Sequence, residues 1–171
     1  MKKNKKNIFI ALLTTFTLVL SIIDFYIPLP TNIMGVKLGL ANIIILSSIL
    51  LFNFKDTLLI VFMRCILQSL FIGGMSTLFF SLPAGLASFM TMYLLNRHFK
   101  KHINTITISL IGSWTHMCTQ IIVVIIIMPT FYLVPMIPFM LISSTITGTL
   151  IGMITKHLAE HLRRLKLNFI G

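Results

Sequence analysis

Acidic residues are almost missing from this chain of 171 amino acids, which has 3 Asp and Glu against 14 Lys and Arg. Charged residues make up 10% of the sequence, whereas a soluble domain carries about 25% because its surface must be polar. Hydrophobic residues account for 57%, and the mean hydropathy is +1.00. These values exclude a soluble enzyme and predict an integral membrane protein.

The scarcity of carboxylates and of cysteine excludes further classes. The three acids, Asp24, Asp56 and Glu160, are far apart in sequence, so they form no cluster of the kind that holds Mg²⁺ in prenyl and phosphoryl transfer. No phosphate-binding GxxxxGK[ST] loop occurs. Cys65 and Cys118 both lie in apolar runs, which favours packing thiols over a disulfide or a metal site. We expect no enzyme, no cofactor and no metal site.

What the chain has instead is long apolar runs, and a spanning helix needs about 20 such residues. We predict an all-α polytopic membrane protein, a six-transmembrane-helix bundle in a single membrane domain over residues 1–171. A signal peptide is the alternative for the first run, but the run is long and no small-x-small cleavage site follows it. The predicted spans are about 8–27, 38–54, 57–72, 75–95, 103–128 and 132–154, followed by a basic tail over 155–171 that we expect to form an amphipathic surface helix.

The positions of the basic residues predict the orientation. With the N-terminus inside, 12 of the 14 lie in cytoplasmic segments, against Lys37 in an outer loop and Arg64 inside a span. Such an asymmetry indicates that both termini are in the cytoplasm of a cell-membrane protein. It also accounts for the net charge of +11, so we expect no nucleic-acid partner.

A few polar residues fall at membrane depth, where burial is costly and a functional role is the usual reason for it. Arg64 and Gln68 are four residues apart and share one helix face, and His116 and Gln120 repeat that spacing. Asn42 adds an amide in the second span.

Two interpretations of these residues remain open. In one, Arg64 is neutralised by Asp24 or by backbone carbonyls, and His116 and Gln120 join helices. In the other, they line an outward-facing pocket in which Arg64 holds an anionic group, with the loop from Pro28 to Lys37 as its gate. Metal binding at His116 is not favoured, because no second ligand stands at suitable spacing.

Small residues recur every four positions on the sixth predicted span, at Ser144, Gly148 and Gly152. Such a ridge lets another helix approach closely. The second helix belongs either to the same bundle or to a partner subunit, and we consider Gly148 and Gly152 candidate docking residues.

Several motifs resemble the Gx transporter family, also catalogued as heptaprenyl diphosphate synthase component I. The most specific is the block Gly35-Val-Lys-Leu-Gly-Leu-Ala-Asn42, and the resemblance extends from about residue 8 to 155. The other matching segments are Ile27-Pro-Leu-Pro30, Phe62-Met-Arg-Cys-Ile-Leu-Gln-Ser69, Ser81-Leu-Pro-Ala-Gly85, Thr115-His-Met-Cys-Thr-Gln120 and Ser144-Thr-Ile-Thr-Gly148.

That family is similar to the substrate-binding S components of energy-coupling factor (ECF) transporters, which are six-helix membrane proteins. The resemblance implies capture of a small molecule from outside and association with a transmembrane T subunit and two ATPase subunits within the lipid membrane. S components often dock through Ala-xxx-Ala on their first helix, and this chain has Ala11 and Thr15 at the nearest equivalent positions.

We therefore expect a membrane substrate-binding subunit for a small molecule such as a quinone, isoprenoid or flavin precursor. The residues expected to bind it are Lys37, Asn42, Arg64, Gln68, His116 and Gln120. The alternative is a non-catalytic accessory factor of polyprenyl diphosphate or quinone biosynthesis.

Overall fold

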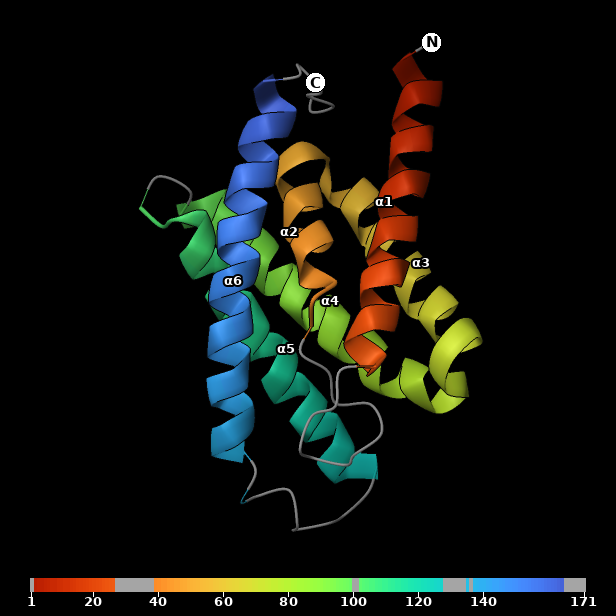
Figure 1. Ribbon diagram of the computed structural model, residues 1–171, viewed down its shortest axis with the longest axis vertical. Coiled ribbons are helices and arrows are strands. Elements are labelled where there is room, and N and C mark those ends of the chain that lie inside the picture. The colour runs from red at the N-terminus through yellow and green to blue at the C-terminus, as the bar shows by residue number, and fades with distance from the viewer. Residues whose placement is uncertain (1, 27–38, 100–101, 128–134, 136, 165–171) are drawn as a thin grey trace.

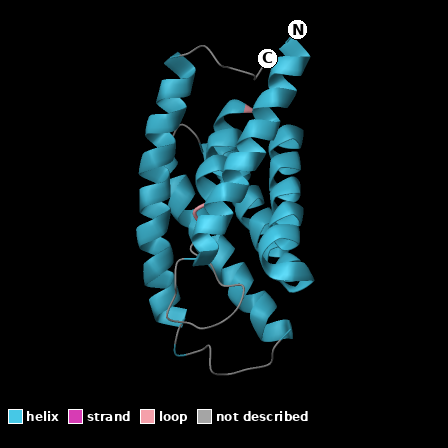
Figure 2. Ribbon diagram, turned by 45° about the vertical axis from the view of Figure 1, so that its right-hand side comes forward, coloured by secondary structure: helices cyan, strands magenta, loops and turns pink. Residues whose placement is uncertain are grey.

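The computed structural model describes residues 2–26, 39–99, 102–127, 135 and 137–164. Every element in these ranges is helical (Figure 2). The helices are α1 (Lys2–Tyr26), α2 (Asn42–Leu51), α3 (Phe54–Gln68), the π-helical turn η1 (Ser69–Gly73), α4 (Gly74–Phe99), α5 (Thr105–Ile127) and α6 (Ile137–Arg164).

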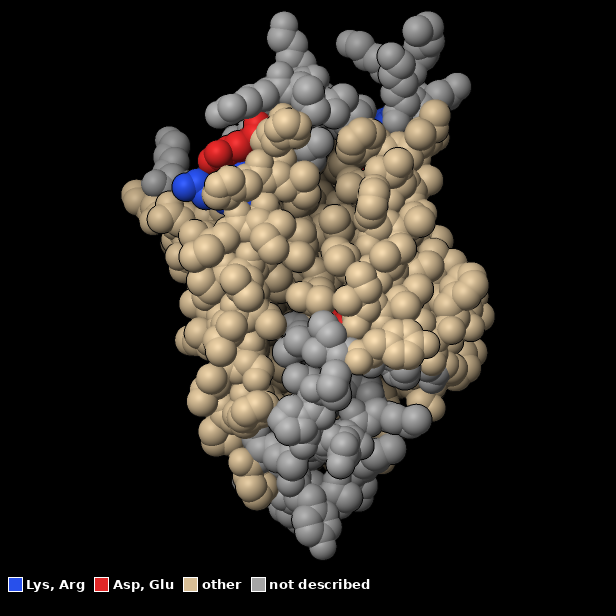
Figure 3. All heavy atoms as spheres, viewed as in Figure 1, with Lys and Arg blue, Asp and Glu red and all other residues tan. Residues whose placement is uncertain are grey.

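Successive helices run in alternating directions, so the start of α1 and the end of α6 lie at the same end of the bundle (Figure 1). Outside the bundle interior, the Lys and Arg residues whose side chains are described all lie toward this end, which we call the basic end: Lys6, Lys55, Arg97 and Lys156. On the face shown in Figure 3, most charged atoms of the described residues gather there, and the rest of the described surface is almost all uncharged. Lys6 Nζ lies 2.7 Å from Asp56 Oδ2 and joins the starts of α1 and α3.

Four helices are long and apolar enough to cross a membrane: Lys6–Asp24 within α1, Gly74–Phe99, Thr105–Ile127 and Ile137–His161. This supports a membrane protein, since a spanning helix needs about 20 apolar residues. The predicted second span at 38–54 is much shorter in the structure, where α2 has 10 residues. The third helix has 15 residues and continues into η1.

The short α2 is a core element. Nine of its ten residues are buried, and it contacts α1, α3, α4, α5 and α6. Its own hydroxyls add no unpaired group, because Ser47 and Ser48 donate to the carbonyls of Ile43 and Ile44. Thr155 of α6 also donates to Ile43 O, at 3.3 Å. Because the other helices surround α2, its apolar residues are buried on all sides.

The sixth helix is longer than predicted. Helix α6 runs without a break from Ile137 to Arg164, so the predicted division at residue 155 between a span and a surface helix is absent from the described chain. Its last turns pass Lys156 and Glu160, both exposed. A continuous helix keeps every backbone group hydrogen-bonded where the chain leaves the apolar region.

Candidate functional site

Arg64 is placed on the inner face of α3 with 2% of its surface exposed. Its Nε donates to Ser21 Oγ of α1 at 3.2 Å. Within the described ranges, Nη1 has no hydrogen-bond partner and no carboxylate lies within ion-pair distance of the guanidinium. A buried charge without a counter-charge is unfavourable.

Asp24, a candidate partner of Arg64, instead accepts hydrogen bonds from backbone N–H groups. Its Oδ2 accepts hydrogen bonds from the N–H groups of Gly39 and Leu40, at 2.8 and 3.2 Å. These two residues form the turn that leads into α2, where Asn42 N donates to Gly39 O. Asp24 therefore fixes the start of α2 against the end of α1. Lys37, another predicted binding residue, lies outside the described residues.

Gly39 brings α2 and α5 together. Its φ is +84°, a conformation that glycine adopts without strain. A Cβ at this position would lie 3.1 Å from Asn42 Nδ2 and 3.6 Å from His116 Cδ2. The side chains of Asn42 and His116 thus border the same glycine, although they come from different helices. Asn42 is 1% exposed and His116 2%.

The two glutamines lie one helical turn beyond these groups. Gln68 follows Arg64 on α3 and Gln120 follows His116 on α5, with 0% and 1% of their surfaces exposed. Near Gln68, the Sγ of Cys65 approaches the carbonyl of Ser81 at 3.6 Å, which joins α3 to α4. The five described residues of the predicted pocket are therefore all buried, and we call them the polar cluster: Asn42, Arg64, Gln68, His116 and Gln120.

Most other buried polar side chains of the bundle donate to backbone carbonyls. Thr14, Thr17 and Ser21 donate to carbonyls four residues earlier on α1, and Ser88 and Ser109 donate to carbonyls of neighbouring helices. In the described part of the chain, both amide atoms of Asn42 and of Gln68 lack a hydrogen-bond partner. Because an unpaired buried amide is costly, these side chains are suited to a polar ligand.

The sequence interpretation did not assign three further buried serines to the pocket. The hydroxyls of Ser81, Ser113 and Ser144 are buried and have no partner among the described residues. A signal for Ser113 was available, because Ser109, Ser113, His116 and Gln120 follow one another at helical spacing on α5. All four are buried.

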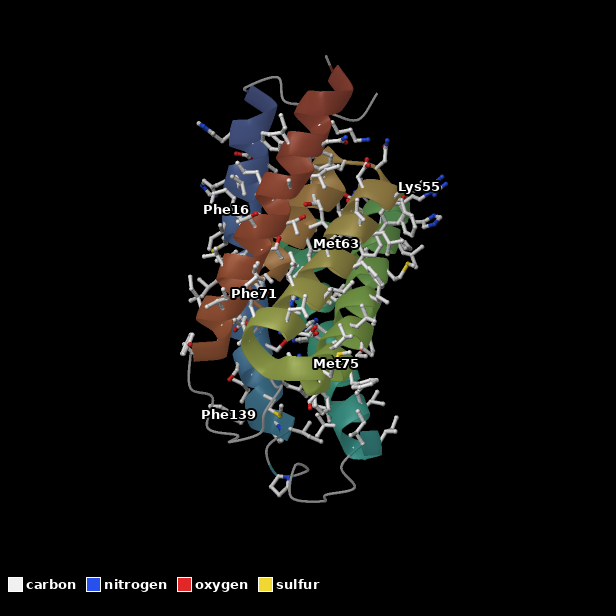
Figure 4. All side chains as sticks on the ribbon, turned by 90° about the vertical axis from the view of Figure 1, so that its right-hand side faces the viewer. Phe16, Lys55, Met63, Phe71, Met75 and Phe139 are labelled. Atoms are coloured by element: carbon white, nitrogen blue, oxygen red, sulfur yellow. The ribbon has the colours of Figure 1, made fainter. Side chains whose placement is uncertain are left out.

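The predicted docking residues fall in two different environments. Ala11 and Thr15 are exposed on α1 and line a groove of about 510 Å³ beside Leu59, Met63 and Leu67 of α3. Figure 4 shows α1 and α3 toward the viewer, with Phe16 on α1 and Met63 on α3.

Gly148 and Gly152 are buried and pack inside the chain. Cβ atoms there would lie 2.9 Å from Ser113 Oγ and 2.6 Å from Ile106 Cα of α5. This is the internal packing that the small-residue ridge also predicted.

Among the described residues, no group of three His, Cys, Asp or Glu side chains is arranged to hold a metal ion. The polar cluster contains a cation, two unpaired amides and an imidazole, but no pair of carboxylates. These side chains can interact with another group through charge and hydrogen bonds.

One comparison with known proteins identifies a relationship. The family model described as heptaprenyl diphosphate synthase component I matches residues 13–158. This range includes every member of the polar cluster. No curated protein and no solved structure matches the chain.

Proposed function

The chain belongs to the heptaprenyl diphosphate synthase component I family, and from this membership we propose that it is a membrane substrate-binding subunit for transport. It captures a small molecule from the outer face for uptake, in the manner of an ECF S component. It performs no chemistry on that molecule.

One observation carries the proposal: Arg64 is 2% exposed and has no ion-pair partner among the described residues. Structural cations in membrane bundles are usually paired, and an intramembrane charge that is not paired marks a ligand or ion pathway. Asn42 and Gln68 support the same role, since their amides have no described partner. His116 and Gln120 complete the binding residues, together with Lys37 of the outer loop.

The partners follow from the same proposal. Transport against a gradient needs an energy source, so the chain works with a T subunit and two ATPase subunits in the cell membrane. The groove beside Ala11 and Thr15 is suited to docking the T subunit, because it is apolar, exposed and lies between two helices. The cargo is a quinone, isoprenoid or flavin precursor.

Mass spectrometry of small molecules extracted from the purified chain tests the binding role. Wild-type protein is expected to release a molecule that is absent from preparations of Arg64→Met. Arg97→Met serves as the matched control, because Arg97 is an exposed arginine in the last turn of α4. Equal amounts of every extracted molecule from Arg64→Met and wild type would contradict the proposal.

A second candidate function is an accessory factor of polyprenyl diphosphate or quinone biosynthesis, which the printed name of the family favours. The two functions predict different partners. Affinity purification of the chain from its native membrane yields ATPase subunits if it is a transport component. It yields a prenyl-transferring enzyme, with no uptake in liposomes, if the accessory role is correct.

A further inference from the structure

Two side-chain amides of the polar cluster are buried without hydrogen bonds to any described residue. Asn42 begins α2 and Gln68 ends α3, and 1% and 0% of their surfaces are exposed. In each amide, neither the oxygen nor the nitrogen has a partner in the described part of the chain. An amide oxygen accepts hydrogen bonds and an NH₂ group donates two, so both kinds of hydrogen bond are missing.

The helices that carry these amides do not supply the missing donors. At the start of α2, the N–H groups of residues 42–45 already donate to carbonyls of residues 39–41. After Gln68, the N–H of Ser69 already donates to carbonyls in the last turn of α3. The buried hydroxyls of α1 differ, because a hydroxyl can donate to a carbonyl of its own helix. Both amide oxygens therefore need a donor from outside their own helices.

The backbone also changes next to Gln68. Helix α3 ends at this residue, and the π-helical turn η1 begins at Ser69. Single π-helical turns are rare and occur frequently at functional sites. The unpaired amide and the altered backbone are separate observations at one position, and both indicate a binding role.

A ligand that displaces water from these amides has to bring donors as well as acceptors. A hydrocarbon body satisfies neither atom of an amide, and a quinone body offers acceptors alone, so it leaves both amide oxygens unpaired. Groups left unpaired after water is displaced lower the affinity. The amides therefore select against an isoprenoid or quinone body in contact with them.

The shape of a side-chain amide selects the partner further. Its oxygen and one N–H of its NH₂ group lie on the same edge, so they match a group whose own N–H and C=O share an edge. In an open-chain secondary amide the bond is trans, and the N–H and C=O point in opposite directions. A ring holds the amide cis, which places N–H beside C=O and allows two parallel hydrogen bonds.

We propose that the substrate contains a nitrogen ring with cyclic amide, imide or ureide edges, and that these edges pair with the amides of Asn42 and Gln68. This inference rests on the proposed binding function and names the class of its substrate. Of the cargo types proposed above, a flavin ring has such an edge, whereas an isoprenoid or quinone body has none.

The test uses the full chain in lipid nanodiscs and small ring compounds as probes. Uracil and succinimide carry the cis edge, their N-methylated counterparts lack the N–H, and duroquinone carries acceptors alone. At millimolar concentration, we expect uracil and succinimide to raise the Tm and the other compounds to leave it unchanged. Equal shifts from a compound and its methylated counterpart, or no shift from uracil and succinimide, would overturn the inference.

The outcomes separate this inference from the function on which it rests. If the purified chain releases a small molecule but neither uracil nor succinimide changes the Tm, small-molecule binding stands and the substrate class is wrong. If no molecule is released and no probe changes the Tm, the proposed function fails together with the substrate class.

Variants connect the effect to the two amides. Asn42→Leu and Gln68→Met remove both polar atoms at little change in volume, and each is expected to weaken binding of uracil about tenfold, the loss typical of a neutral hydrogen-bonding group. The control Asn53→Leu should bind as wild type, because Asn53 is exposed and its side chain makes no capping hydrogen bond. Unchanged binding by both cluster variants would overturn the inference.

The ligand-free Tm distinguishes a binding amide from a structural one. Because an unpaired buried amide is unfavourable, Asn42→Leu and Gln68→Met are expected to raise the Tm while they weaken binding. A lowered Tm in both variants would mean that another part of the chain pairs with these amides, and the inference would be wrong.

Discussion

Arg64 stands in an environment that is unfavourable for a charged side chain. Its guanidinium is buried beside Ser21, and no described carboxylate pairs with it. Functional sites commonly keep such unfavourable groups because a ligand completes them, and the ligand-free protein is less stable as a result. Replacing Arg64 is expected to raise stability and to weaken ligand binding, so one variant tests both effects.

Replacing Arg64 by methionine should stabilise the ligand-free chain. Replacing even a paired buried charge and its partner by apolar residues is often neutral or stabilising by about 1–4 kcal/mol. Arg64 has no described ion-pair partner to leave behind, so the Tm in nanodiscs should rise. The same variant should fail to retain the small molecule that the wild-type protein releases. A lowered ligand-free Tm would mean that the guanidinium is a structural partner in the bundle.

Gly39 offers a second test at residue scale, with Gly74 as its control. Both have positive φ, +84° and +64°, so alanine at either position should cost about 1–2 kcal/mol. A Cβ at Gly39 also meets Asn42 Nδ2 at 3.1 Å, whereas nothing lies within 4 Å of one at Gly74. Gly39→Ala should therefore weaken binding as well as lower the Tm, and Gly74→Ala should only lower the Tm. Equal binding by the two variants would argue against a site at Asn42.

The sequence predicted which residues are buried better than it predicted their partners. The spacing of Arg64 with Gln68 and of His116 with Gln120 identified inner helix faces, because four residues make about one turn. The role of Asp24 was not predictable, since its partners are backbone N–H groups of Gly39 and Leu40. A side-chain pattern contains no information about which backbone groups a turn presents.

At the scale of elements, hydropathy predicted apolar runs but could not fix helix ends. Residues 38–54 form a single apolar run, yet α2 begins at Asn42 after the turn at Gly39 and ends at Leu51. Phe52 and Asn53 are extended. In the other direction, α6 continues past residue 155, because helix formation there does not require apolar residues.

The contact between α5 and α6 depends on small residues. Alanine at Gly152 in this contact and alanine at Gly85 of α4 are predicted to change the Tm in opposite directions. A Cβ at Gly152 would lie 2.6 Å from Ile106 Cα, which is backbone and cannot turn aside, whereas one at Gly85 meets Cys65 Sγ at 3.5 Å and Val61 Cγ1 at 3.6 Å. Gly152→Ala should lower the Tm by forcing the helices apart. Gly85→Ala should raise it slightly, since alanine is better than glycine in a helix by about 1 kcal/mol. Thermal unfolding followed by circular dichroism measures both, and a tolerated Gly152→Ala would mean that the two helices are less closely packed.

The groove between α1 and α3 gives a prediction about assembly. Thr15→Leu places a larger side chain in the groove, and Thr107→Leu makes the same change at an exposed position of α5. Co-purification of T and ATPase subunits should fall for Thr15→Leu and remain at the wild-type level for Thr107→Leu. Equal recovery with both variants would place the docking surface elsewhere on the molecule.

For the whole molecule, the alternation of helix directions agrees with the distribution of charge. Lys6, Lys55, Arg97 and Lys156 belong to different helices, yet all lie toward one end. Charge asymmetry across loops predicts the side of the membrane on which an end lies. In the fold, every second connection between helices lies at the same end, and the basic residues belong to these segments and to the ends of α1 and α6.

Cysteine labelling determines the orientation directly. In a Cys118→Ser background, in which Cys65 remains buried, Pro135→Cys is placed between α5 and α6, at the end opposite the basic end. His102→Cys is placed between α4 and α5, at the basic end, and both positions are exposed. A membrane-impermeant maleimide added to intact cells should label Pro135→Cys, and should label His102→Cys only after permeabilisation. The reverse result would put the basic end outside, because the impermeant reagent reaches only that side. Capture of cargo from the outer face would then be wrong, whatever the polar cluster binds.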